Sequence, residues 1–423
     1  MPPRANIDRA PSAVHMRRRC LTFDLFYKQN HYLYCYLTVF ERRYTIYIII
    51  LLNNKCFCGV LYMMAGLESL DHSAIRMPAE WEPHACCWMA WAVHPEWGMA
   101  ANKVKRELSE IVQTIARYEP VRLLAPRGSA LREAQHEFSA CSNVTVIDAP
   151  VDDIWMRDIA PTFALRSNGP DQEVIAIDWN FNAWGGTKKR RPRHGDKLAR
   201  RAKSIFGASR VSVLFVAEGG ALITDGQGTL ITTRSCLLNP NRNPIRRGKD
   251  RQQGIELALA KLGVRTVIWL EGDPCEALTS GHADAYVLFA PSGVVLVEAC
   301  DDNTPERPMW RGHDIALLES ATNAEGRKLR VRRVNAPHQR YWKGNGKAFA
   351  PCYLNAYVTN GAVISARFGD AERDYAAKNA LGRAFPGREV VMLRIDHIAN
   401  GGGGVHCLTQ PMPSRQQALE NID

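Results

Sequence analysis

The stretch that decides the fold is YVTNGAVISARFGDAERDYAAKNALGRAFPGREVVMLRI, residues 357–395. Two valine-containing runs flank Asn360-Gly361, a dipeptide that favours a β-hairpin. A helix is expected over residues 370–384, because its first residue is an aspartate that can cap the N-terminus. The apolar run 389–395 predicts a strand. The expected order is therefore hairpin, helix, strand.

The same order recurs upstream, over residues 286–334. The runs 286–289 and 294–297 flank a Pro-Ser-Gly turn and predict a second hairpin. A helix near 315–321 and a strand at 329–334 follow. Units repeating at such a spacing indicate several supersecondary repeats about a shared axis.

Strand and helix signals also alternate nearer the beginning of the regular region. The apolar run 86–92 precedes a segment, 104–115, whose apolar residues have helical spacing, and the run 121–125 follows. This order predicts a strand, a helix and a strand, so the fold class is α/β.

Composition excludes several classes of protein. The 423 residues are 46% hydrophobic and 23% charged, which excludes disordered and fibrous chains. The net charge of +11 suggests nucleic acid, but residues 1–76 hold 10 Lys and Arg against 5 Asp and Glu, which leaves 44 against 38. The densest basic cluster is more typical of a solvated loop than of a nucleic-acid site. It consists of Lys188, Lys189, Arg190, Arg191 and Arg193.

The 12 cysteines are scattered. The close pairs, Cys56 with Cys58 and Cys86 with Cys87, lack the spacing of zinc or redox motifs. A reducing compartment, the cytoplasm, is the expected location.

The first 76 residues differ in composition from the rest. The apolar stretch 44–52 is roughly half of the ~20 residues that a membrane span needs. We expect residues 1–76 to be a poorly ordered extension or sequence upstream of the true start, residues 77–415 to form the catalytic domain, and residues 416–423 to be a tail.

Four segments hold more glycine, tryptophan and ionisable residues than a core needs. They are DDIWMRDIAPTF (152–163), AEGG (217–220), TSGHAD (279–284) and NGGGGVHCLTQ (400–410). On an extended strand, His282 and Asp284 would face the same side. Taken singly, the first segment could be a salt-bridged loop without a function, and a solvated turn explains AEGG equally well. The pair in TSGHAD is more often a polar strand edge than a catalytic pair.

Cys407 has an unusual setting. A cysteine is more often a small buried hydrophobic residue than a nucleophile. Here the glycine run 401–404 precedes His406 and Cys407, and consecutive glycines cost roughly 1 kcal/mol each relative to alanine in a regular element. Such a run indicates that a ligand or main chain passes close by.

Seven motifs in this order resemble those of the agmatine deiminase family, which includes the bacterial peptidylarginine deiminases. They are MPAEWEPH (77–84), DDIWMRD, DWNFNAWGG (178–186), AEGG, LLNPNRNP (237–244), SGHAD and GGGGVHCLTQ. The resemblance runs from Met77 to about Pro411. It implies a five-bladed, pseudo-symmetric α/β propeller of hairpin-helix-strand modules around a central active site.

The resemblance implies a covalent mechanism, with Cys407 as nucleophile and His282 as acid and base. His282 would give a proton to departing ammonia and then take one from the hydrolytic water. Glu218 would pair with His282 and keep it protonated early in the cycle. Asp158 and Asp284 would bind the guanidinium, since its planar, permanent charge calls for paired carboxylate acceptors. A thiolate is needed because resonance makes the guanidinium carbon a poor electrophile, and the bound cation would favour the thiolate.

Three further residues are implied to bind substrate. Trp155 and Trp184 would form the walls of the slot, and Asn355 corresponds to a site asparagine of the family. The implied substrate is agmatine, a small cation, with no cofactor, metal, nucleic acid or membrane required; a homodimer is compatible with the resemblance.

Alternatives remain for the substrate and for the class of protein. Ala285 and Tyr286 after Asp284, and SGHAD in place of NGH, depart from many plant-type members and leave the distal end of the substrate open. One alternative is a deiminase of peptidylarginine or another arginine derivative, in which Arg157 or the basic stretch near Lys188 would pair with the substrate carboxylate. Another is a catalytically inactive binding module. A basic nucleic-acid-binding protein is suggested by the charge alone.

Overall fold

The computed structural model divides into two compact units, Met1–Leu70 and Asp71–Asp423. In the first unit it describes three strands, and in the second it describes residues 75–168, 171–186, 197–244, 250–299, 309–343 and 349–415. The first unit contains an antiparallel sheet of order β1-β2-β3, with bounds Leu21–Gln29, Tyr32–Val39 and Tyr44–Leu51. The expected division into residues 1–76, 77–415 and 416–423 stays a prediction. The basic cluster near Lys188 lies outside the described residues.

The described part of the second unit contains five sheets. The first has the order β10-β9-β8-β4, with bounds Ser209–Ser212, Asp171–Asp178, Thr162–Asn168 and Ile75–Arg76. Three sheets have three strands each: β11 (Ile223–Thr224), β12 (Thr229–Thr233) and β13 (Thr266–Leu270); β14 (Val287–Ala290), β15 (Val294–Ala299) and β16 (Arg330–Asn335); β17 (Tyr357–Val358), β18 (Ala362–Arg367) and β19 (Glu389–Arg394). The last has the order β20-β5-β6-β7, with bounds Gln410–Pro413, His84–Ala90, Val121–Ala125 and Val144–Asp148.

One pairing pattern recurs in all five sheets. Each contains an antiparallel pair followed by a parallel pair, as in β17-β18-β19. In the last sheet β20 pairs with β5, so that Gln410 lies opposite Trp88. The two ends of the catalytic unit are thereby joined in one sheet.

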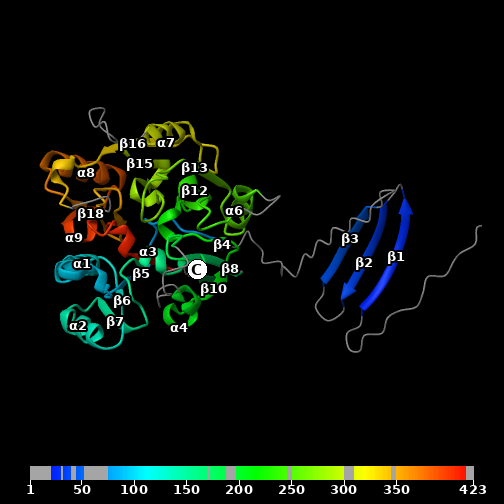
Figure 1. The fold of residues 1–423 in the computed structure, drawn as a ribbon, viewed down its shortest axis with the longest axis horizontal. Helices are drawn as coiled ribbons and strands as arrows, with labels where there is room; N and C mark the ends of the chain where they lie inside the picture. The colour runs from blue at the N-terminus through cyan, green and yellow to red at the C-terminus, as the bar shows by residue number, and fades with distance from the viewer. Residues whose placement is uncertain are drawn as a thin grey trace, which may run out of the picture. The chain divides into compact units, whose positions relative to one another are not determined.

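Helices connect the strands and lie toward the outside of the unit, while the one-turn helix α3 lies near its middle (Figure 1). Their bounds are α1 Ala101–Ala116, α2 Ser129–Glu137, α3 Met156–Ile159, α4 Ala202–Phe206, α5 Arg234–Leu237, α6 Arg251–Ala260, α7 Met309–Ser320, α8 Ala371–Ala384 and α9 Asp396–Ala399. Among the described residues, no helix combines the length and the apolar character that a membrane span needs.

The helix expected from spacing within 104–115 is confirmed as α1. Val104, Leu108, Ile111 and Ile115 are fully buried in the same core cluster as Leu123 of β6. Fully burying an aliphatic side chain stabilises a fold by about 1.5–3 kcal/mol. This apolar face therefore holds α1 against its sheet.

The hairpin, helix and strand predicted over 357–395 are also confirmed. The side chain of Asp370 accepts a hydrogen bond from the backbone N–H of Arg373 (3.3 Å) and caps α8. The turn differs from the usual Asn-Gly turn, because neither Asn360 nor Gly361 has a positive φ. Instead, Asn360 bonds through its side chain to both backbone groups of His84, and so ties this hairpin to β5.

Candidate active site

Four short turns carry the residues expected to catalyse the reaction. They are α3 with Asp158, the 3-10 turn Gly219–Ala221 after Glu218, the 3-10 turn Ala283–Ala285 with His282 and Asp284 at its start, and the 3-10 turn His406–Leu408 with Cys407. α3 contacts the turns beside Glu218 and Cys407, and the turn beside Glu218 contacts the one beside His282. The structure thus brings together residues from distant parts of the chain, as in the hydrogen bond from Arg157 to His406, 249 positions away.

His282 and Asp284 do not lie on an extended strand, so that prediction was wrong. The backbone turns sharply before them, with positive φ at Ser280 (62°) and Gly281 (88°). The two side chains nevertheless converge: His282 Nδ1 is 3.9 Å from Asp284 Oδ1 and 3.9 Å from Asp158 Oδ1. Both carboxylates therefore face the same nitrogen of the imidazole ring.

The thiol of Cys407 lies beside this group. Its Sγ is 3.6 Å from Asp284 Oδ2 and accepts a hydrogen bond from Asn355 Nδ2 (3.2 Å). The backbone N–H of Cys407 donates to Asn355 Oδ1 (3.2 Å), so one amide fixes both the main chain and the sulfur. Burial, together with the charges of Asp284 and Asp158, raises the pKa of the Cys407 thiol well above its ordinary value.

The two carboxylates have different surroundings. Asp158 accepts hydrogen bonds from Trp184 Nε1 (2.7 Å) and the backbone N–H of Gly220 (3.0 Å), yet burial raises its pKa. Burial acts in the same direction on Asp284, but bonding to His406 outweighs it, so the pKa of Asp284 lies below its ordinary value. A bound cation would therefore bring the raised pKa of Asp158 back toward its ordinary value, whereas the pKa of Asp284 is already low.

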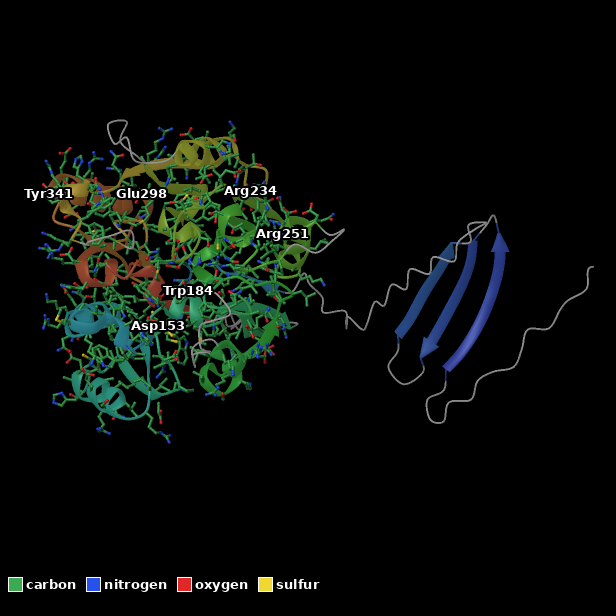
Figure 2. The ribbon with its side chains drawn as sticks, viewed as in Figure 1. Asp153, Trp184, Arg234, Arg251, Glu298 and Tyr341 are labelled. Atoms are coloured by element: carbon green, nitrogen blue, oxygen red, sulfur yellow. The ribbon has the colours of Figure 1, made fainter. Side chains whose placement is uncertain are left out.

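Trp184 is held in a strained loop. Ala183, Trp184 and Gly185 all have positive φ, at 63°, 56° and 75°. Such a conformation costs about 1–3 kcal/mol for each residue other than glycine, so the surroundings must enforce it. The bond to Asp158 does so in part, and Figure 2 shows Trp184 near the middle of the unit.

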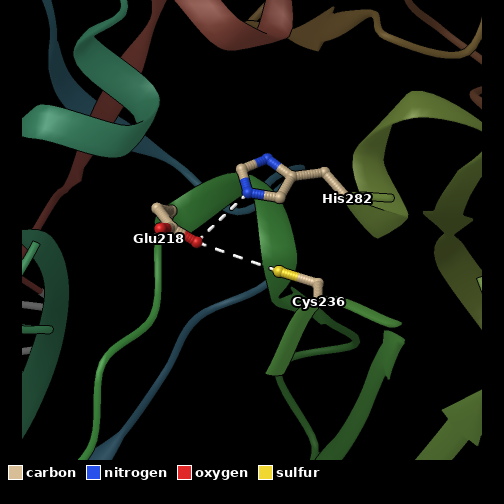
Figure 3. Close-up of side chains that lie close together, drawn as sticks. All are labelled: Glu218, Cys236 and His282. Atoms are coloured by element: carbon tan, nitrogen blue, oxygen red, sulfur yellow. Dashed lines mark hydrogen bonds and ion pairs between the residues drawn. The ribbon is translucent and has the colours of Figure 1, made fainter. Parts of the chain in front are cut away.

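Behind His282, its second nitrogen faces a buried ion pair. His282 Nε2 lies 3.2 Å from Glu218 Oε2, and Arg242 Nε donates to both oxygens of Glu218 at 2.9 and 3.0 Å. Arg242 also donates to Ser280 Oγ and the carbonyl of Thr279, on the loop that carries His282. Burial would raise the pKa of Glu218, but His282 and Arg242 hold it below its ordinary value. Figure 3 shows the Glu218 carboxylate facing both His282 and the thiol of Cys236.

His406, next to Cys407, has different contacts. His406 Nδ1 bonds to Asp284 Oδ2 (2.8 Å) and His406 Nε2 to Glu80 Oε2 (2.8 Å). Arg157 Nη2 is 2.9 Å from the same oxygen of Glu80. Burial alone would raise the pKa of Glu80, but Arg157 and His406 lower it to about 2. His406 thus links Asp284, through Nδ1, to Glu80, through Nε2.

The glycine run is required by close approaches. A Cβ on Gly403 would lie 2.4 Å from the ring of Trp155, and one on Gly404 would lie 2.7 Å from Asn355 Oδ1. The run follows the short helix α9. Trp155 therefore packs directly against the segment that leads to Cys407.

A model of the Porphyromonas-type peptidyl-arginine deiminase family matches residues 76–413. The chain belongs to this family. It is 34% identical to the agmatine deiminase of Pseudomonas aeruginosa strain LESB58, over 81% of this chain and 96% of the relative. It is also 34% identical to the agmatine deiminase of Medicago truncatula, over 80% and 96%. A solved agmatine deiminase of Enterococcus faecalis is similar with a TM-score of 0.72 and 27% identity, over 82% of this chain and 97% of that chain. The family predicted from the motifs is confirmed.

Sequence reasoning did not assign roles to several residues of this peptidyl-arginine deiminase family site. Glu80, Arg242 and His406 all lie within the motifs that carried the resemblance, so their motifs were found but their contacts were not. Arg157 was considered as a partner for a substrate carboxylate, whereas it is buried against Glu80 and His406. The alternative of a solvated turn for Glu218 was wrong, because its side chain is fully buried.

Proposed function

We propose that this chain hydrolyses the guanidinium of agmatine to N-carbamoylputrescine and ammonia through a covalent intermediate on Cys407. The observation that carries the proposal is one cluster in which two carboxylates, Asp158 and Asp284, face the same nitrogen of His282 while the Cys407 thiol lies 3.6 Å from Asp284. A planar cation seated against both carboxylates would be within reach of the nucleophile and of the acid at once. The relatives named agmatine deiminase support this choice of substrate.

Substrate binding would activate the nucleophile. The charges of Asp284 and Asp158 help to keep the thiol of Cys407 protonated. A guanidinium between them offsets these charges, which lowers the thiol pKa and releases its proton to solvent. The thiolate then attacks the guanidinium carbon and forms a tetrahedral adduct.

His282 would move the remaining protons. Burial lowers its pKa, but Asp158, Cys236 and Glu218 raise it well above its ordinary value, so the ring begins protonated. It gives a proton to the departing nitrogen, which leaves as ammonia, and an amidino-thioether remains on Cys407. The neutral ring then takes a proton from water, the hydroxide attacks the thioether carbon, and Cys407 leaves as a thiolate.

Trp155, Trp184 and Asn355 would position the reactants. Trp184 orients the Asp158 carboxylate through a hydrogen bond, and Trp155 packs against the glycine run beside Cys407. Their rings offer apolar faces to the methylene chain of agmatine. Asn355 would hold the sulfur in line with the carbon it attacks.

We also infer that the five sheets are five blades of a propeller about a pseudo-symmetry axis through the active site. The repeated antiparallel-then-parallel pairing supports this arrangement. The pairing of β20 with β5 would close the ring.

The test of the chemistry is Cys407→Ser. A hydroxyl is far less ionised than a thiol near neutral pH, so ammonia release from agmatine should fall by several orders of magnitude while the circular dichroism spectrum stays that of the parent. Ammonia release within a few-fold of the parent would exclude Cys407 as nucleophile.

The test of the substrate is a specificity ratio. A pocket that presents the Asp158 and Asp284 carboxylates repels an additional substrate carboxylate unless a cation pairs with it, and Arg157 is already engaged with Glu80. We expect kcat/KM for agmatine to exceed that for arginine and for a C-terminal arginine peptide. An equal or higher value for the peptide would favour a peptidylarginine deiminase with the same mechanism.

A further inference from the structure

A second thiol lies behind the acid/base histidine. Cys236, on α5, has its Sγ 3.9 Å from Glu218 Oε2, and His282 Nε2 is 3.2 Å from that same oxygen. The three candidate ligand atoms lie within 4.8 Å of one another (Figure 3). The side chains of Cys236 and Glu218 are fully buried and that of His282 is 2% exposed. In the proposed reaction Cys236 forms no bond to the substrate and transfers no proton.

Two of the three separations, those from Glu218 Oε2 to the sulfur and to the nitrogen, are close to the separations in a tetrahedral zinc site. With Zn–S near 2.3 Å and Zn–N and Zn–O near 2.0–2.2 Å, neighbouring ligand atoms lie about 3.3–3.6 Å apart. The distances from Glu218 Oε2 to Cys236 Sγ (3.9 Å) and to His282 Nε2 (3.2 Å) are within a few tenths of an ångström of that range. Thiolate and imidazole ligands favour Zn²⁺ and similar thiophilic ions over Mg²⁺ or Ca²⁺.

We propose that Glu218, Cys236 and His282 form an inhibitory site for a thiophilic divalent cation such as Zn²⁺. The thiol and the imidazolium release their protons to solvent on binding, and no group is oxidised or reduced. The thiolate and the Glu218 carboxylate then balance the charge of the ion. Arg242 holds both oxygens of Glu218 from behind and fixes the ligand, as the outer partners of metal ligands do.

The place of the site predicts the kind of inhibition. His282 Nδ1 faces Asp158 and Asp284, whereas the ion would bind Nε2 on the opposite edge of the ring. The ring then keeps its proton on Nδ1 and cannot alternate between acid and base. Substrate still binds, so kcat falls and KM does not change. An ion on Cys407 would instead compete with agmatine.

The binding test uses Co²⁺ as a probe, because cobalt bound to a thiolate absorbs through charge transfer. It is carried out on full-length Cys407→Ala, which removes the competing nucleophile. We expect one equivalent of Co²⁺ to give this absorption and Zn²⁺ to displace it. Adding Cys236→Ser should weaken binding at least about tenfold, since even outer partners cost 10–100-fold. Cys236→Ala carries the same test if serine alters the fold.

The matched control is Cys275→Ser in the same background, because Cys275 is an exposed thiol. It should leave the cobalt signal unchanged. A signal that survives loss of Cys236, or that disappears with Cys275, overturns the site. So does an absence of any thiolate absorption in Cys407→Ala.

The kinetic test uses the parent enzyme, pre-incubated with Zn²⁺, with agmatine varied. We expect noncompetitive inhibition, with an inhibition constant at least about tenfold higher in Cys236→Ser, each variant being compared with its own zinc-free rate. Competitive inhibition that is unchanged in Cys236→Ser overturns the proposal and assigns the ion to Cys407. This test rests on the proposed deiminase activity, whereas the cobalt test does not, so a chain that binds cobalt but releases no ammonia would contradict only the function.

Discussion

The candidate active site contains two Arg–Glu–His series built from the same residue types, one fully enclosed and one whose glutamate, Glu80, is part-exposed. In the first, Arg242 holds Glu218, and Glu218 lies 3.2 Å from His282 Nε2. In the second, Arg157 lies 2.9 Å from Glu80, and Glu80 lies 2.8 Å from His406 Nε2.

The two histidines differ at the other ring nitrogen. Nδ1 of His406 is bonded to Asp284 at 2.8 Å, while Nδ1 of His282 is 3.9 Å from its nearest carboxylates. A ring with both nitrogens in short hydrogen bonds serves as a support, and a ring with one nitrogen turned toward the reactants can exchange a proton there. Residue type therefore does not distinguish the two histidines, although His406 is the one next to Cys407. We propose that the occupancy of Nδ1 distinguishes them, which makes His282 the acid.

The largest expected effect separates the two histidines directly. His282→Asn should lower kcat for agmatine by about 10²–10⁴-fold, the usual contribution of a general acid or base. His406→Asn should cause a smaller loss, mostly in KM, because it disturbs how Asp284 is held and moves no proton. Steady-state kinetics of both variants measure the difference. A larger kcat loss in His406→Asn would reverse the comparison.

Glu218→Gln tests whether the first series tunes His282. Loss of the carboxylate charge lowers the raised pKa of His282, so the ring loses its proton at lower pH and the alkaline limb of kcat moves to lower pH. The variant also leaves Arg242 buried without its carboxylate, at a cost of about 3–5 kcal/mol in stability. Glu80→Gln is the control, and its alkaline limb should stay where the parent has it.

Glu80→Gln in turn tests the second series through acid stability. Arg157 and His406 outweigh burial and hold the pKa of Glu80 in the folded protein at about 2, below its pKa in the unfolded chain. The ionised Glu80 therefore makes its full contribution to the free energy of unfolding at any pH above its pKa in the unfolded chain. This contribution is lost as pH falls from about 4.3 toward 2 and amounts to about 3 kcal/mol. Urea unfolding should show the parent more stable at pH 6, with the gap closing near pH 2. A gap independent of pH would show that packing, and not charge, makes the difference.

The smallest effect concerns the strand β4, which lies just before the expected start of the catalytic domain at Met77. Ile75 is buried in the core and Arg76 pairs with Glu82, on the segment that carries Glu80. A variant beginning at Met64 should keep the stability of the full chain, whereas one beginning at Met77 should lose about 2 kcal/mol, the value of one buried isoleucine. Thermal unfolding of both compares them. Equal stability would mean that β4 contributes nothing to the support of Glu80.

Local patterns carried much of the prediction. The apolar spacing within α1, the cap at Asp370 and the hairpins depend on residues close to one another in the sequence, so the sequence alone predicts them. Cys407, Asp158 and Asp284 were expected in one site through motif resemblance, and the structure brings them together, while their catalytic roles stay predictions.

The two supporting series could not be predicted in this way. Glu80 and His406 are 326 positions apart, and nothing in either motif indicates that one binds the other. The sharp turn before His282 was missed because alternation along a strand was assumed where Ser280 and Gly281 reverse the chain. Cys236 gave no signal in the sequence, since an isolated cysteine after a strand is typical of a core.

Gly220 is a position at which the site leaves no space for a side chain. A Cβ there would lie 2.6 Å from His282 Nδ1, 2.9 Å from Asp284 Oδ2 and 3.1 Å from Asp158 Oδ1. Every codon change that alters this residue adds that atom, because glycine alone lacks it. No replacement is conservative at such a position, however small or polar the new side chain. In a scan of all substitutions, Gly220 would therefore tolerate as few replacements as Cys407, although it has no side chain that could take part in the reaction.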